Sequence, residues 1–249
     1  MLIIFPVCDR IKLLPYFLQY YSSIGATQFV CGLYNGEKSL LYNKVSSYKR
    51  HFNLQIQTSF TSDPSLWNTH SETHGLNRIR EEYSKKYDWY CIADLDEFHY
   101  FKGKTLPEMV QEAEQGGYDA MHGVFFDRIA IDGAFPDIKG TLDKTFPLVC
   151  DLTKCARLAS SKIVMARNHV KIHSGHHKTN AKTWYNAAEV HHFKWSKGVY
   201  ESITFHYNRY QRQGLRTADG WPRILKLIDG GVDIANPKLR VRPASKLGI

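Results

Sequence analysis

The chain has 249 residues, a formal net charge of +9, and 43% hydrophobic and 23% charged residues. This composition is ordinary for a folded globular protein and excludes a disordered chain, and the length is sufficient for a large hydrophobic core. No apolar run approaches the roughly 18 residues that span a bilayer, and the opening run is too short for a signal peptide. We therefore expect a cytoplasmic protein, which could associate peripherally with a membrane.

The cysteines indicate the compartment of the protein, and the basic charge indicates its possible partners. Five cysteines without a CxxC pair predict neither a disulfide framework nor a zinc ribbon, and they fit a reducing compartment. A basic balance suits polyanionic partners such as nucleic acid, an anionic membrane surface or a phosphate-bearing substrate. It could equally serve solubility alone.

The first hundred residues alternate between strand-like and helix-like segments. Apolar runs predict strands at residues 1–7, 28–34, 54–60 and 89–94. Amphipathic segments predict helices at residues 13–25, 39–52 and 74–87. This order predicts a mostly parallel sheet covered by helices, in which ligands bind at the carboxyl ends of the strands.

The alternation is looser after residue 100. We expect a helix at residues 106–117, a strand and turn at 118–131, and a strand-like segment at 162–177 with His169, Lys171 and His173 on one face. A short strand at residues 190–195 should lead into a long helix from about 199 to 213. The last thirty residues hold one weak helix and a basic tail.

The segment WYCIADLDEF carries an apolar strand directly into Asp94, Asp96 and Glu97. Carboxylates this close repel one another, and burying them unpaired is costly, so we expect a positive partner there. Two aspartates two residues apart on an extended chain point the same way and could hold one Mg²⁺ or Mn²⁺ ion. The alternative is a cap on the amides of a helix N-terminus.

Six of the twelve histidines fall between His169 and His192. A zinc set of His169, His173, His176 and His177 lacks a partner set with known spacing, so most of these residues are expected to be polar surface groups. The pair His191 and His192 follows an apolar residue. Because adjacent strand residues point opposite ways, at most one of the two should face a site.

Four segments in order resemble nucleotide-sugar glycosyltransferases of the GT-A fold, in the glycosyltransferase family 2-like group. They are FPVCDRIKLLPYFLQYYSSIGATQFVCGLYNG, WYCIADLDEF, FFDRIAIDGAFP, and VHHFKW followed by a helix with Arg209, Tyr210 and Gly214. The resemblance covers roughly residues 1–215.

The resemblance implies an α/β fold of GT-A (Rossmann-like) type, with a mostly parallel central sheet flanked by helices in a single domain at residues 1–215. The nucleotide-sugar half would occupy about residues 1–100 and the acceptor half about 101–215, with a helical and basic extension at 216–249. The implied reaction moves a sugar from a UDP-, GDP- or dTDP-sugar to a glycan, lipid-linked sugar or glycoprotein acceptor. Its cofactor would be Mn²⁺ or Mg²⁺.

The resemblance also implies a metal site. Asp96 would ligate the cation directly, and Asp94 would hold the donor's ribose or reach the cation through water. His192, or else His191, would be a later ligand. Glu97 is expected to support the others or to act as a cap.

The nucleotide pocket would be lined by the end of the first strand. Pro6, Asp9 and Arg10 stand there. Asn77 and Arg78, on the helix before the WYCIADLDEF strand, could reach the donor's base or phosphates. Arg78 and Arg80 could instead be solvated helix residues.

An inverting transferase also needs a base for the acceptor hydroxyl, and the candidates are Asp127 and Asp132. Asp127 could instead form a structural ion pair with Arg128 or another base. Asp132 precedes a glycine and could be a turn residue.

Two other functions fit parts of the pattern. A metal-dependent nuclease or phosphodiesterase would use the carboxylates and the basic charge, but no nucleic-acid-binding module appears, so we expect no nucleic-acid partner. A GT-A-like protein that binds without catalysis is the second alternative.

Overall fold

The computed structural model describes residues 1–7, 10–33, 40–58, 69–212, 214 and 220–249. These form two compact units, residues 1–124 with 161–190 and residues 125–160 with 191–249. Strands β6 (Ala120–Ile129) and β9 (Thr183–His192) each run from the first unit into the second. The division expected at residue 215 stays a prediction.

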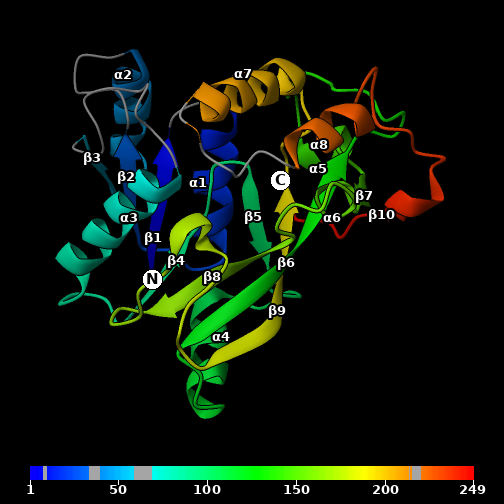
Figure 1. Ribbon diagram of the computed structural model, residues 1–249. Coiled ribbons are helices and arrows are strands. Elements are labelled where there is room, and N and C mark those ends of the chain that lie inside the picture. The colour runs from blue at the N-terminus through cyan, green and yellow to red at the C-terminus, as the bar shows by residue number, and fades with distance from the viewer. Residues whose placement is uncertain (8–9, 34–39, 59–68, 213, 215–219) are drawn as a thin grey trace. The chain divides into compact units, whose positions relative to one another are not determined.

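The first unit alternates strands and helices along its first hundred residues (Figure 1). Its further strands are β1 (Leu2–Val7), β2 (Gln28–Leu33), β3 (Leu54–Gln57), β4 (Trp89–Ile92), β5 (Glu97–Tyr100) and β8 (Ser161–Arg167). Its helices are η1 (Ile11–Leu13), α1 (Leu14–Ser23), α2 (Leu40–Ser46), η2 (Ser47–Arg50), α3 (Thr69–Tyr83), α4 (Leu106–Gln115) and η4 (Ser174–His176). The predicted alternation of strands and helices is confirmed.

The sheet of the first unit is mixed. The order β3-β2-β1-β4 is parallel throughout, whereas β8 pairs antiparallel with β4 and with the first half of β6. The fold is α/β as expected, but the expectation of a mostly parallel sheet is wrong beyond β4. A parallel pair of β6 and β8 would need a crossover connection, usually a helix, packed on the first unit. The segment between these two strands belongs to the second unit instead, and β8 returns antiparallel to β6.

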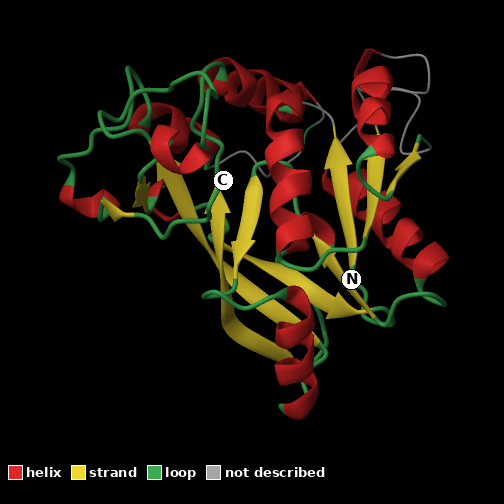
Figure 2. Ribbon diagram, turned by 180° about the vertical axis from the view of Figure 1, so that it is seen from behind, coloured by secondary structure: helices red, strands yellow, loops and turns green. Residues whose placement is uncertain are grey.

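Helices cover both faces of the parallel strands (Figure 2). Leu2 and Ile4 of β1 pack in one core cluster with Leu76 and Ile79 of α3. The ring of Phe5, on the opposite face, lies 4.9 Å from Phe17 of α1. Every residue of β1 is buried, as expected for a strand that is covered on both sides.

Two expected elements end early. The strand-like segment at 162–177 is a strand only as far as Arg167, so His169, Lys171 and His173 do not share a strand face. The expected helix at 39–52 has its described α-helical part at Leu40–Ser46 and continues as η2. The turn expected at Asn35 and Gly36 lies outside the described residues.

The second unit builds its own core on the far half of β6. That half pairs antiparallel with β7 (Leu148–Cys150), which pairs antiparallel with β10 (Arg242–Pro243). Its helices are α5 (Leu142–Thr145), α6 (Leu152–Cys155), α7 (Val199–Arg212), α8 (Trp221–Leu227) and η6 (Pro237–Leu239). Trp195, Val199 and Ile203 pack there against Ile224 and Ile228.

No helix among the described residues is long and apolar enough to cross a membrane.

One histidine of the first core titrates abnormally. His99 of β5 is 0% exposed, and its Nδ1 lies 3.4 Å from the sulfur of Cys91. Burial, helped by the charge of Lys162, lowers the pKa of His99 to about 3. The ring is therefore neutral in the folded protein at the pH where an unfolded histidine is already protonated.

His99→Gln should reduce the pH dependence of stability. Between about pH 6.5 and 3 the unfolded chain binds a proton at this position that the folded chain does not, so the unfolding free energy falls as the pH falls, by up to about 1.4 kcal/mol per pH unit. Urea titrations across this range should give a shallower slope for the variant. The exposed His51→Gln variant serves as control, and equal slopes for wild type and His99→Gln would contradict the prediction.

Candidate functional site

The site lies where the chain changes direction across the sheet. From β1 the chain proceeds to β2 and β3 on one side, and β4 then pairs with β1 on the other side, Ile4 beside Ile92. The gap between the carboxyl ends of β1 and β4 is therefore the topological switch point, where ligands bind in open α/β sheets. Arg10 follows β1 there, and the residues from Asp94 to Glu97 follow β4.

The segment after β4 is a tight turn. The amide of Glu97 donates to the carbonyl of Asp94 at 2.9 Å, and Oε2 of Glu97 accepts from the amide of Asp94 at 3.1 Å. The expectation that Asp94 and Asp96 lie on an extended chain is therefore wrong, because Glu97 closes the turn at both ends. The two aspartates have different partners.

The positive partners expected for the carboxylates come from the chain itself. Nζ of Lys162 lies 2.8 Å from Oδ2 of Asp94 and 2.7 Å from Oε2 of Glu97, and this lysine is 2% exposed. Nε of Arg10 lies 3.1 Å from Oδ2 of Asp96. Three carboxylates thus meet two cations, which leaves one negative charge on the turn.

The antiparallel strand β8 explains how a lysine so distant in sequence arrives there. The register pairs Trp89 with Arg167 and Cys91 with Met165. Continuing this register three residues past Cys91 places Asp94 opposite Lys162. The mixed sheet therefore supplies the counter-charge.

The pKa values keep the group ionised. Burial alone would raise the pKa of Asp94, but the charge of Lys162 outweighs it and the pKa lies below its ordinary value. Burial would lower the pKa of Lys162, but Asp94 and Glu97 raise it above the ordinary value. Asp94 and Lys162 are therefore both charged at neutral pH.

Two of the residues expected at the nucleotide pocket lie near the switch point. Pro6 lies in β1 beside Gly32, one residue before the strand ends. Arg10 has a left-handed backbone with φ 53°, which is unfavourable for a residue with a side chain. Asp9 lies outside the described residues.

The other two expected nucleotide contacts lie on α3. The amide of Asn77 is buried and donates to the carbonyls of Thr73 at 2.9 Å and Ile172 at 3.0 Å, so it holds the fold together. Arg78 is exposed. Their roles toward a donor stay predictions.

One group of side chains among the described residues could hold a metal ion. It consists of Glu72, Asp94 and His176, with one ligand atom from each, all within 4.8 Å of one another. It contains Asp94 but not Asp96. The sequence indicated the histidine-rich segment without singling out His176, and nothing in the pattern indicated Glu72 or Lys162.

In the second unit, Asp127 is the centre of a hydrogen-bonded cluster. It is 1% exposed, and it accepts from the amide of Thr153 at 2.7 Å, from Oγ1 of Thr153 at 2.7 Å and from Nε1 of Trp195 at 2.9 Å. Nδ1 of His192 lies 3.1 Å from its Oδ1. Asp127 thus orients His192 and Trp195.

The neighbouring predicted residues have other surroundings. Arg128 pairs with Asp143 at 2.5 Å, whereas the basic side chain that contacts Asp127 is His192, at 3.1 Å. The alternative of an ion pair between Asp127 and a base other than Arg128 stays a prediction. Asp132 is exposed and accepts from the amide of Ala134 at 3.0 Å, as a turn aspartate does. His191 is 0% exposed and lies 3.5 Å from Nη1 of Arg128. Metal binding by His191 and His192 stays a prediction.

Comparisons with known proteins add little to this geometry. No family model matches the chain, and no curated protein matches it. Among the solved structures it resembles is HddC from Yersinia pseudotuberculosis, with 8% identity and a TM-score of 0.39 over 81% of this chain and 96% of that one. A likeness at this level supports no functional conclusion.

Replacing Lys162 by methionine should destabilise the first unit strongly. Methionine keeps the apolar stem but removes the cation beside Glu97, whose side chain is 4% exposed, and removing one partner of a buried ion pair costs about 3 kcal/mol or more. Denaturant unfolding measures the change. In the control Lys104→Met the lost pair with Glu112 is exposed and should cost less than about 1 kcal/mol. Similar losses in both variants would show that the buried pair has no special weight.

Proposed function

We propose that the protein is a metal-dependent glycosyltransferase that moves a sugar from a nucleotide-sugar donor to a glycan, lipid-linked or protein acceptor. The observation that carries the proposal is the position of the charged turn. An ionised carboxylate turn and an arginine meet at the topological switch point, where α/β sheets bind nucleotides. The resemblance of WYCIADLDEF and VHHFKW to the GT-A group supports the same reaction.

The chemistry suits such a turn. A nucleoside diphosphate leaves as a doubly charged group, and a bound divalent cation would stabilise the charge that develops as the glycosidic bond breaks. Asp94 fits a cation because its Oδ1 is buried without a hydrogen-bond partner among the described residues. Lys162 keeps that carboxylate ionised.

Arg10 and Asp96 would bind the donor together. The guanidinium of Arg10 stands at the end of β1 and suits a phosphate oxygen, because its planar array of donors matches phosphate geometry. Asp96 holds that guanidinium in place through its 3.1 Å contact. A direct metal bond from Asp96 would require it to share its carboxylate between the arginine and the ion.

For an inverting reaction the acceptor's proton would go to Asp127 or Asp132. Asp127 already accepts three hydrogen bonds from Thr153 and Trp195, whereas Asp132 is exposed. These contacts favour Asp132 as the base and give Asp127 the task of orienting His192.

Nucleotide binding tests the proposal directly. Thermal melts with UDP, GDP, dTDP or CMP, each with and without Mn²⁺, should show one nucleotide that stabilises the protein only with the metal. At a hundredfold excess over Kd the gain is about 2.7 kcal/mol. Asp96→Asn should abolish the shift by releasing Arg10, whereas the exposed Asp88→Asn should retain it.

Other outcomes favour the alternatives. Stabilisation by an oligonucleotide but by no mononucleotide would favour the nuclease. Nucleotide binding without release of nucleoside diphosphate from any donor sugar would favour a GT-A-like binding protein.

A further inference from the structure

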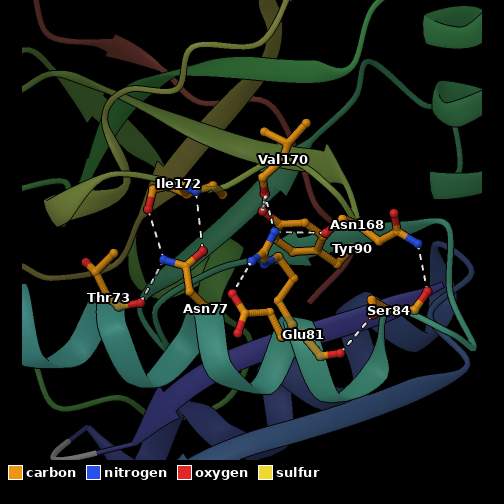
Figure 3. Close-up of polar contacts among 9 residues, drawn as sticks. Thr73, Asn77, Glu81, Ser84, Tyr90, Asn168, Val170 and Ile172 are labelled. Atoms are coloured by element: carbon orange, nitrogen blue, oxygen red, sulfur yellow. Dashed lines mark hydrogen bonds and ion pairs between the residues drawn. The ribbon is translucent and has the colours of Figure 1, made fainter.

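Helix α3 fixes the loop that follows β8 by bonds from its side chains to the loop's backbone (Figure 3). Asn77 donates to the carbonyl of Ile172 at 3.0 Å, and Arg80 donates to the carbonyls of Asn168 at 2.9 Å and Val170 at 3.0 Å. One turn toward the start of the helix, Oγ1 of Thr73 accepts from the amide of Gly175 at 3.3 Å. The loop is therefore attached to the helix at four points between Asn168 and Gly175.

This attachment delivers His176 to the start of α3. His176 is 2% exposed and has a left-handed backbone with φ 60°, next to Gly175 with φ 73°. A left-handed histidine is tolerated only where its surroundings hold it. Glu72 precedes Thr73 on the helix, so the bond from Gly175 to Thr73 brings the histidine and the glutamate to the same place.

Within the described part of the chain, Asp94 and His176 each have one side-chain atom without a hydrogen-bond partner. Oδ1 of Asp94 and Nε2 of His176 are both buried, and neither has a hydrogen-bond partner among the described residues. A buried polar atom without a partner costs about 1–3 kcal/mol. Both residues belong, with Glu72, to the group whose ligand atoms lie within 4.8 Å of one another.

The two oxygens of Asp94 have different surroundings. Oδ2 is bound by Lys162 at 2.8 Å, whereas Oδ1 has no protein partner in the described part of the chain. The lysine fixes the carboxylate, so Oδ1 is presented in a set position. The imidazole of His176 is 2% exposed, and its Nε2 has no hydrogen-bond partner among the described residues.

We propose that Glu72, Asp94 and His176 bind one divalent transition-metal ion. Metal–ligand bonds of roughly 2.0–2.3 Å allow one ion to join the three atoms with small side-chain shifts. An imidazole beside two carboxylates favours Zn²⁺, Co²⁺ or Mn²⁺ over Mg²⁺, which prefers oxygen ligands alone. Three protein ligands leave a coordination position for water or a substrate oxygen.

This site differs from the one that the sequence predicted. It shares Asp94 but takes its other ligands from α3 and from the loop after β8. If the proposed transferase is correct, this would be its metal site, but the binding of the ion requires no nucleotide.

The test uses the full chain after treatment with a chelator, titrated with ZnCl₂, CoCl₂, MnCl₂ or MgCl₂ without nucleotide. Calorimetry should give one ion per chain, with Mg²⁺ the weakest, and Co²⁺ should show the visible absorption of a site with a nitrogen ligand. His176→Gln and Glu72→Gln should each weaken binding about tenfold or more. The exposed His173→Gln and Glu82→Gln are the matched controls and should bind as wild type does.

Unchanged affinity in folded His176→Gln and Glu72→Gln would overturn the proposal. A Co²⁺ spectrum of the wild-type protein that shows no nitrogen ligand would also overturn it. This measurement tests the proposal even if a variant does not fold. Failure of this site is distinguishable from failure of the proposed function. A Mn²⁺-dependent nucleotide shift that persists in both variants would retain the transferase and reject the site, whereas metal binding without any nucleotide effect would do the reverse.

Discussion

The rest of the first unit's site depends on the ion pairs of the buried Lys162 ammonium with Asp94 and Glu97. Asp94, Asp96 and Glu97 follow a buried strand of the sheet. Without a counter-ion these carboxylates would repel one another, and burying them there would be costly. Lys162 contacts two of them within 2.8 Å, and the turn closed by Glu97 depends on the same carboxylate oxygen that the lysine holds. The lysine reaches them because β8 is antiparallel to β4.

That antiparallel strand also joins the charged turn to α3. After β8 ends at Arg167, the side chains of Arg80 and Asn77 bind the backbone of the following loop. This loop continues toward the start of α3, where His176 lies near Glu72. One strand therefore contributes a cation to one oxygen of Asp94 and, through the loop after it, a histidine to the same group of side chains.

The alternation of β1 to β4 with their helices could be predicted because it depends on local periodicity. The need for a positive group beside Asp94 was also predictable, since it follows from charge alone. That Lys162 supplies it was not, because the pairing direction of β8 leaves no mark on the sequence of either strand. The divergence of Asp94 and Asp96 depends on Glu97, whose two bonds convert an expected strand into a turn. The sequence also could not single out His176 among the six histidines from His169 to His192. Its place near Glu72 depends on the bond from the neighbouring Gly175 to Thr73 of α3.

The energetic cost of this arrangement is itself an argument about its use. A buried ion pair is often no more stabilising than apolar side chains of the same size, so stability alone does not explain three carboxylates at a strand end. Arg10 and His176 both have left-handed backbones, and each such residue is strained by about 1 kcal/mol or more. Oδ1 of Asp94 and Nε2 of His176 add the cost of buried atoms without partners in the described chain. The strain at His176 and the unsatisfied atoms of His176 and Asp94 belong to one group of side chains. They indicate a site arranged to bind something, because an arrangement serving only the fold would gain from their removal.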